Sequence, residues 1–310
     1  MPAPRISVGL PQYVPDESAP IVTRYAALAE ELGFAGLWTV DTVPGAGTSR
    51  APALDGVHLL TAAAAVTGEI GLGVSVIVLP ARNPARLAGE LAPIDRLSDG
   101  RLTVGVGIGR DDPVAESLGL SADRRVRRFR EGLAIMRAVW AQDDVSFGGE
   151  LYRFSDVSIE PKPTQRPGPP VWFGAGTEPA LRRAARLGDG WMGSGPSSSA
   201  AFAEQVRLLE DALRQEDRDR DGFPIAKRVF MAVEDTEARA RDRLAARLDG
   251  FYGAPGLTER VAICGPPAAC AEGLAELVGA GAHELVLNPL YDHLRQLEAL
   301  TEVTALVRAA

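Results

Sequence analysis

Residues at the ends of apolar runs are the parts of this 310-residue sequence that could do chemistry. Asp41 follows the run GLWTV, and the run TVGVGIGRDD carries Gly105, Gly107 and Gly109 and then Arg110. A carboxylate can relay a proton or contact the polar edge of a ring, and an arginine can pair with an anion through its planar fork. The alternatives are a loop cap for Asp41 and, for Arg110, a pair with one of the two aspartates that follow it.

The alternate glycines raise the question of a dinucleotide-binding turn. Such a turn needs G-x-G-x-x-G after the first strand and a helix that begins at the third glycine. Here the spacing is G-x-G-x-G, and Pro113 interrupts any immediate helix. We therefore expect a barrel strand whose small residues let a flat ring lie against Gly107 at the strand's end, with plain packing as the alternative.

A second glycine-rich segment, GAGTEP, is a candidate phosphate site. Gly174 and Gly176 allow backbone N–H groups to turn inward, and Thr177 adds a hydroxyl. The helix that follows directs the positive end of its dipole to the same place.

Eight apolar runs alternate with helical patterns along the chain, and they favour parallel strands covered on both faces. They are Arg5–Leu10, Gly36–Val40, Ile70–Leu79, Leu102–Gly107, Pro170–Ala175, Gly190–Gly193, Val229–Val233 and Glu284–Asn288. Strict alternation over this length predicts an α/β fold, one (β/α)8 TIM barrel that spans residues 1–310. An insertion after the fourth strand holds the helix Asp123–Ala141, the hairpin-like piece SFGGELYRF and a proline-rich link.

Composition argues against several classes of protein. The net charge is −8, and we expect the arginine-rich run RRVRRFR to form a salt-bridged helix face and not a nucleic-acid site. The two cysteines and three histidines have no metal-ligand spacing, so we expect no metal. The sequence shows no signal peptide and no run of 18 apolar residues, which predicts a cytoplasmic protein that does not enter a membrane.

Several motifs together resemble the bacterial luciferase-like superfamily of flavin and deazaflavin oxidoreductases along nearly the whole chain. They include AEELGFAGLWTVD, LGVSVIVLPARNPARLAGELAPIDRLSDGRLTVGVGIG, PKPTQRPGPPVWFGAG and AARLGDGWM. The resemblance implies a TIM barrel with an insertion after strand four, a homodimer, and FMN or coenzyme F-420 at the carboxyl rim of the barrel.

The resemblance also implies roles for individual positions. Asp41 matches the acidic residue near the deazaflavin ring, and Ser75 and Val76 match a bulge that backs the ring and contains a non-prolyl cis peptide. Two further segments match the cofactor-binding part of strand four and the phosphate-binding turn: Gly107, Ile108 and Gly109, and Gly174, Ala175, Gly176 and Thr177.

Three departures from the superfamily bear on the reaction. Its sugar-phosphate dehydrogenases carry a histidine where this chain has Thr42 and a glutamate where it has Arg110. In its flavin luciferases an arginine reaches the FMN phosphate from the position of Ile108. We therefore predict a coenzyme F-420-dependent oxidoreductase acting on a small molecule, with Asp41 and Arg110 as catalytic candidates.

The alternatives are an FMN-dependent monooxygenase and a non-catalytic flavin-binding barrel. Three further polar residues are candidates to line the substrate side of the rim: Gln12, Thr42 and Asn288.

Overall fold

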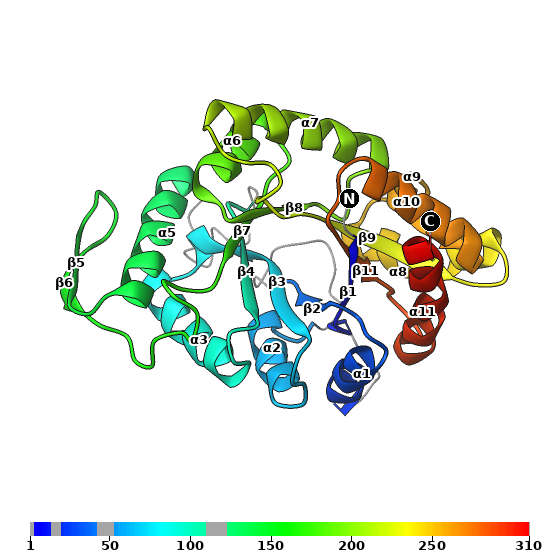
Figure 1. Cartoon of the computed structure of the whole chain (residues 1–310), viewed down its shortest axis with the longest axis horizontal. Helices are drawn as coiled ribbons and strands as arrows, with labels where there is room; N and C mark the ends of the chain where they lie inside the picture. The colour runs from blue at the N-terminus through cyan, green and yellow to red at the C-terminus, as the bar shows by residue number, and fades with distance from the viewer. Residues whose placement is uncertain (1–2, 14–19, 42–52, 110–122, 310) are drawn as a thin grey trace.

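Eight parallel strands close into a barrel in this computed structural model, which describes residues 3–13, 20–41, 53–109 and 123–309 (Figure 1). In order around the ring the strands are β1 (Arg5–Gly9), β2 (Gly36–Thr39), β3 (Gly71–Val78), β4 (Leu102–Gly107), β7 (Val171–Gly174), β8 (Gly190–Gly193), β9 (Ile225–Val233) and β11 (Glu284–Asn288). Pairing of β8 with β9 and of β11 with β1 closes the ring. The predicted TIM barrel is confirmed.

Helices cover the outside of the barrel (Figure 1). They are α1 (Pro20–Glu31), α2 (Gly56–Ala64), α3 (Pro84–Leu97), α5 (Arg125–Ala141), α6 (Glu178–Leu187), α7 (Ser199–Gln215), α8 (Glu237–Tyr252), α10 (Pro267–Gly279) and α11 (His293–Ala309), with the short η1 (Leu79–Ala81) and α9 (Leu257–Val261). Local sequence sets several of their starts. At α3, for example, the Asn83 side chain accepts a hydrogen bond from the Arg86 N–H, and Pro84 occupies the first turn.

Three elements differ from the sequence-based expectation or add to it. Strand β9 begins at Ile225, four residues before the predicted start at Val229. The strand accommodates Lys227 and Arg228 because both cations donate hydrogen bonds, Lys227 to Ser197 and Arg228 to Ser75 and Asn288. A short strand β10 (Ile263–Gly265) pairs with the end of β9. Within the insertion, β5 (Val145–Gly148) and β6 (Arg153–Val157) form the antiparallel hairpin that SFGGELYRF predicts.

Two tryptophans fill the interior of the barrel below its carboxyl rim. The rings of Trp38 on β2 and Trp172 on β7 lie 5.4 Å apart between centroids, and both side chains are buried. Glycines on neighbouring strands make room for them. A Cβ at Gly73 would lie 2.4 Å from Trp38 Cε3, and one at Gly190 would lie 2.6 Å from Trp172 Nε1.

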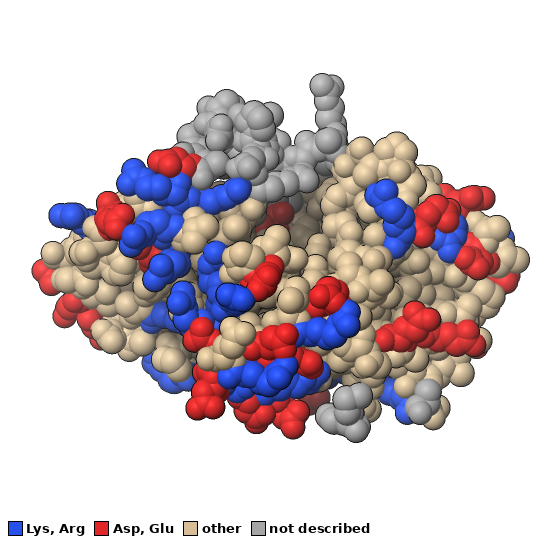
Figure 2. Space-filling model, turned by 90° about the horizontal axis from the view of Figure 1, so that it is seen from above, with Lys and Arg blue, Asp and Glu red and all other residues tan. Residues whose placement is uncertain are grey.

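Charges of both signs mix on the side of the barrel formed by α5 and α6, at the left of Figure 2. Arg127 pairs with Glu150 at 2.9 Å, and Arg137 of the same helix pairs with Asp189 at 2.9 Å. This mixture fits the expected salt-bridged face. No helix in the described part of the chain is long and apolar enough to cross a membrane.

The tryptophan pair generates a first prediction. Gly73→Ala would force a methyl group into Trp38, and overpacking of this kind costs about 1–3 kcal/mol. We expect the free energy of unfolding in urea to fall by that amount. Gly279→Ala is the matched control, because a Cβ there meets nothing within 4 Å. Equal stability of the two variants would contradict the proposed packing.

Candidate functional site

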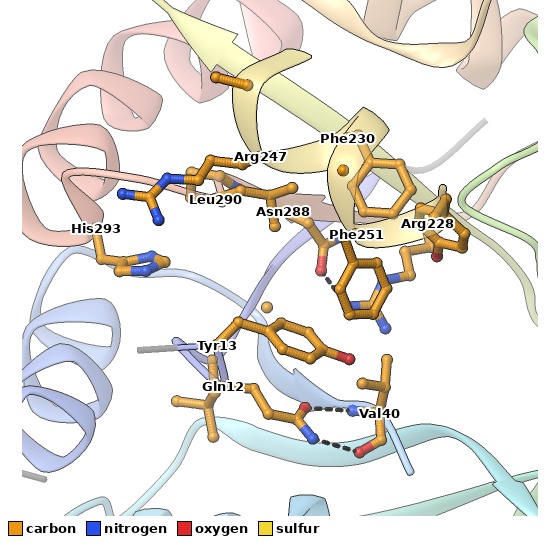
Figure 3. A pocket seen from close by; sticks show the side chains of 16 residues that line it. Gln12, Tyr13, Val40, Arg228, Phe230, Arg247, Phe251, Asn288, Leu290 and His293 are labelled. Carbon is orange, nitrogen blue, oxygen red and sulfur yellow. Dashed lines mark hydrogen bonds between the residues drawn. The ribbon is translucent and has the colours of Figure 1, made fainter. Parts of the chain in front are cut away.

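The carboxyl ends of β1, β2, β9 and β11 surround a cavity of about 260 Å³ (Figure 3). Polar groups reach it from Gln12, Arg228 and Asn288, and aromatic rings come from Tyr13 and from Phe251 in the last turn of α8. Enzymes with this fold build their sites at this end of the barrel. The cavity is therefore the candidate active site.

Arg228 extends from β9 across the mouth of the barrel. Its Nη1 donates to the carbonyl and hydroxyl oxygens of Ser75 on β3, both at 3.3 Å, and its Nη2 donates to Asn288 Oδ1 at 2.6 Å. Strands β3 and β9 stand on opposite sides of the ring. Burial lowers the pKa of Arg228 from its ordinary value, yet a guanidinium stays cationic at neutral pH.

Asn288 is at the rim, as predicted, and its amide has a fixed orientation. Its Nδ2 donates to the carbonyl oxygens of Val286 at 2.6 Å and Val229 at 3.3 Å, so its Oδ1 faces Arg228. Gly9 on β1 leaves the space that this side chain needs, because a Cβ there would lie 2.2 Å from Asn288 Oδ1.

Gln12 also lines the cavity, but its amide bonds to the backbone. Its Nε2 donates to the carbonyl oxygens of Val40 and Leu54, both at 2.8 Å, and its Oε1 accepts from the Val40 N–H at 2.9 Å. These bonds tie the end of β2 to the segment before α2. Gln12 therefore shapes the pocket and does not present a free amide to a ligand.

Aromatic rings form one wall of the cavity. The rings of Tyr13 and Phe251 meet edge to face at 4.5 Å, and Tyr252 contacts both Phe251 and Phe230. Burial raises the pKa of Tyr13 to about 12, so its hydroxyl is neutral near pH 7. The wall is apolar with neutral polar edges, which suits the carbon skeleton of an organic ligand.

His293 and Arg247 lie on the side of the cavity away from Arg228 (Figure 3). The His293 side chain is buried, and its Nδ1 has no hydrogen-bond partner among the described residues. Burial, and secondarily the charge of Arg247, lowers the pKa of His293 to about 4. The imidazole is therefore neutral at pH 7.

Strand β3 carries the irregularity that the sequence predicted. Its register against β4 shifts between Val74 and Ile77, and the Ser75–Val76 peptide bond is cis. The Val76 side chain projects toward the glycines of neighbouring strands. A Cβ at Gly107 would lie 2.8 Å from Val76 Cγ2, and one at Gly174 would lie 2.9 Å from Val76 Cγ1.

This contact shows what the missing side chain of Gly107 makes room for. The Val76 side chain occupies the space into which a Cβ at Gly107 would project, so the packing interpretation of the glycines accounts for Gly107 in this structure. A flat ring against the end of β4 stays a prediction.

Asp41 lies at the end of β2 with its carboxylate engaged on both oxygens. Oδ2 accepts from the Val78 N–H at 3.0 Å, and Oδ1 accepts from Arg82, which also lies 3.5 Å from an Asp55 oxygen. The Asp41 side chain is buried. These contacts connect the ends of β2 and β3 to the start of α2, and they match the cap alternative for Asp41 more closely than a proton relay.

The turn after β7, a predicted phosphate site, leads directly into α6. Thr177 is the N-cap residue of α6, and its side chain makes no capping hydrogen bond. A Cβ at Gly176 would meet only Gln205 Nε2, at 3.5 Å, so the backbone there is open. Gln205 Nε2 donates to the Gly176 carbonyl at 3.3 Å, while its Oε1 is buried without a partner among the described residues. Ala175 accepts a hydrogen bond from Trp191 Nε1 at 2.9 Å.

The remaining predicted residues are Ile108, Gly109 and Arg110, which follow β4, and Thr42, which follows β2. Ile108 is partly buried and packs against the main hydrophobic core. Gly109 has a φ of +70°, and a Cβ there would lie 2.6 Å from Val78 Cγ1. Arg110 and Thr42 lie outside the described residues.

The residues that sequence reasoning missed are Arg228 and the rings of Tyr13 and Phe251. A signal for Arg228 is present in IAKRVFMAV, where two adjacent basic residues interrupt an apolar run. Successive side chains of a strand point to opposite faces, so one of the two must face the barrel interior. The other, Lys227, faces outward and donates to the Ser197 carbonyl and hydroxyl oxygens, both at 2.9 Å.

A closed parallel barrel with a cavity at its carboxyl rim is the architecture found in TIM-barrel enzymes. The family model described as luciferase-like monooxygenase matches residues 5–255, and the chain belongs to this family of oxidoreductases and monooxygenases. The family contains both FMN-dependent and F-420-dependent members.

Three similar proteins differ in how much of this chain they match. A protein of Mycobacterium tuberculosis is 38% identical over 53% of this chain and 57% of its own length. The FMNH2-dependent dimethylsulfone monooxygenase of Pseudomonas putida is 33% identical over 56% of this chain and 48% of its own. The 5,10-methylenetetrahydromethanopterin reductase of Archaeoglobus fulgidus is 28% identical over 76% and 67%. The chain thus spans about half the length of the first two.

Solved structures match over almost the whole chain. A monooxygenase of Streptomyces bottropensis superposes with a TM-score of 0.81 at 25% identity, covering 96% of this chain and 98% of that one. An F-420-dependent secondary alcohol dehydrogenase gives 0.83 at 18% identity, covering 98% and 99%. The second likeness shows the fold alone.

The contact between Val76 and Gly107 predicts an energetic coupling. Gly107→Ala should destabilise the protein by about 1–3 kcal/mol, and the added Val76→Ala change should relieve the clash, because Val76 Cβ lies 3.8 Å from the new methyl group. A double-mutant cycle in urea measures the coupling. Gly105→Ala is the control: its Cβ would also approach Val76 Cγ1, at 3.2 Å, but its main clash is with the Val74 carbonyl oxygen at 2.2 Å, which Val76→Ala leaves in place. Equal rescue of both glycine variants would contradict this geometry.

The buried imidazole of His293 predicts a dependence of stability on pH. Its folded pKa of about 4 lies below the ordinary value of 6.5, so the unfolded chain binds more protons between these values. Stability should fall by up to about 3 kcal/mol as pH drops from 6.5 to 4. His293→Phe should remove this part of the slope in urea unfolding at several pH values. His58→Gln, at a side chain that is 88% exposed, should leave it unchanged.

Proposed function

We propose that this protein is a coenzyme F-420-dependent oxidoreductase that transfers hydride to or from a small organic molecule. The observation that carries the choice of cofactor is Ile108, which is apolar and packs against the core. The luciferase-like resemblance puts an arginine for the FMN phosphate at this position in flavin-dependent members. An isoleucine supplies no charge for that group.

The turn after β7 fits the phosphate of either cofactor. Open backbone at Gly176, the uncommitted Thr177 hydroxyl and the start of α6 together offer donors to an anion. Similarity to the F-420-dependent glucose-6-phosphate dehydrogenase of Beutenbergia cavernae also supports the deazaflavin. That match covers 70% of this chain at 29% identity, whereas the match to the sulfone monooxygenase covers 56%.

In this proposal the chain itself supplies placement and electrostatics. Coenzyme F-420, when bound, supplies the carbon that carries the hydride. Arg228 and Asn288 orient the substrate, while the rings of Tyr13 and Phe251 exclude water from it. Asp41 acts through Arg82 as a positioning residue that holds the ends of β2 and β3. Arg110 stays a candidate for an anionic partner, and the homodimer and cytoplasmic location stay predictions.

An FMN-dependent monooxygenase is the second candidate. It is favoured by the sulfone monooxygenase relative, at 33% identity, and by the Streptomyces bottropensis monooxygenase, at 25% over nearly the whole chain. In that reaction, reduced FMN and oxygen would attack a substrate in the same pocket.

Paired titrations of the purified protein with coenzyme F-420 and with FMN, followed by fluorescence, test the proposal. We expect about micromolar or tighter binding of the deazaflavin and at least about tenfold weaker binding of FMN. Preference for FMN, together with oxygen uptake on addition of reduced FMN and substrate, would move the assignment to the monooxygenase. Turnover with neither cofactor would leave a binding protein.

A variant tests the role of Ile108 in the same assay. Ile108→Arg should raise the affinity for FMN by about tenfold, because it restores a charge-assisted hydrogen bond to phosphate. Ile108→Leu is the control and should leave both affinities unchanged. No gain of FMN affinity in the arginine variant would remove the main support for the deazaflavin.

A further inference from the structure

Arg228 is a cation whose described neighbours are all neutral. No carboxylate among the described residues lies within 4 Å of its guanidinium, and none lines the cavity. Removing a charge from water without an opposite charge is costly, so such a group is normally paired. The protein has a net charge of −8, so carboxylates are plentiful. The lack of one beside Arg228 among the described residues therefore suggests that the cation serves a ligand.

The hydrogen bonds of Arg228 fix its orientation without using all its donors. A guanidinium has five N–H donors. Nη1 donates to both Ser75 oxygens, and Nη2 donates to Asn288 Oδ1. Nε donates to none of the described residues, and Nη2, which carries two hydrogens, has one acceptor among them. The Nε–H and one Nη2 hydrogen lie on the same edge of a guanidinium, and such an edge matches the two oxygens of a carboxylate.

The rest of the cavity suits an organic body attached to that carboxylate. The rings of Tyr13, Phe251 and Phe230 supply apolar contact area, and the Tyr13 hydroxyl carries no charge near pH 7. At the other side the described cation is Arg247, which is exposed, beside the neutral His293 (Figure 3). The described lining therefore contains nothing that would repel an anion.

The position of Arg228 also indicates where a bound anion would lie relative to the predicted cofactor residues. Apart from Asp41, at the end of β2, the predicted cofactor residues lie on or just after β3, β4 and β7, and the cavity lies among the ends of β1, β2, β9 and β11. Arg228 contacts Ser75 of the β3 bulge from the opposite side of the ring. An anion on its free edge lies at the border between the two halves of the mouth.

We propose that Arg228 binds the carboxylate of the substrate, and that the substrate is an organic acid with an aromatic or branched aliphatic body seated against Tyr13 and Phe251. This rests on the proposed function for the reaction, because it names the substrate class of the same site. It assigns to Arg228 the selection of acids over the corresponding neutral alcohols.

Isothermal titration calorimetry with matched probes tests the assignment, using the protein both alone and saturated with coenzyme F-420. The probes are 3-phenylpropionate, 3-phenyl-1-propanol and 2-phenylethanesulfonate. We expect 3-phenylpropionate to bind at about 1 mM or below and at least about tenfold more tightly than the alcohol, since charge-assisted hydrogen bonds supply the difference. Preference for the sulfonate would overturn the carboxylate assignment. Equal binding of acid and alcohol, or no binding of the acid, would overturn the anion site.

Variants then assign the preference to one residue. Arg228→Met should remove the preference for the acid and leave alcohol affinity within about threefold, whereas Arg228→Lys should keep part of it. Arg247→Met is the matched control and should change the preference by less than about threefold. Retention of the full preference in Arg228→Met overturns the role of Arg228. If circular dichroism shows that Arg228→Met does not fold, the ratio of acid to alcohol affinity is compared between the wild-type protein and Arg228→Lys. An unchanged ratio in Arg228→Lys then overturns the role of Arg228.

The same preparations separate this inference from the proposed function. Binding of coenzyme F-420 without any preference for the acid would contradict the substrate class alone. A preference for the acid that Arg228→Met removes, with no binding of either cofactor, would contradict the oxidoreductase function and leave the carboxylate site in place.

Discussion

The tryptophan pair inside the barrel is the packing constraint on which the site depends. Trp38 and Trp172 fill the interior at the level where Gly73 and Gly190 carry no side chain. Because protein interiors are close-packed, the two rings leave no space for the side chains of the next layer, which must lie on the rim side of the rings. Ala226 of β9 packs with the two tryptophans. Arg228 is the next residue of β9 whose side chain points into the barrel, so it lies one layer nearer the rim. The two rings therefore keep a cation at the mouth of the barrel.

A second packing relation sets the other half of the mouth. Val76 fills the space that Gly107 and Gly174 leave, so three strands meet at one valine on the β3 bulge. The valine on β3 complements the glycines on β4 and β7 in size. A larger residue at either glycine therefore requires a smaller one at Val76. The bulge also brings Ser75 within reach of Arg228, which joins the two halves through hydrogen bonds.

Sequence patterns predicted the fold well because each barrel unit has a local signature. An apolar run, a cap such as Asn83 and a helical period lie within about thirty residues of one another. The site was harder to predict, since its partners are distant along the chain. Nothing near Gly107 indicates that Val76 fills its space, and nothing near Asp41 indicates that Arg82 holds its carboxylate. Arg228 was missed because its basic neighbour made the start of β9 resemble a loop.

The polar residues near the rim differ in whether their polar groups are already bonded within the protein. Asp41 and Gln12 have polar atoms that could serve a ligand, but the backbone and Arg82 already use them. Arg228 differs because its described partners are neutral acceptors that orient it without cancelling its charge. A charge held in place by neutral groups retains its field for whatever enters the cavity, and that field requires no rearrangement when the ligand arrives. This preorganised charge distinguishes Arg228 from Gln12, which lines the same cavity but has its amide committed to the backbone.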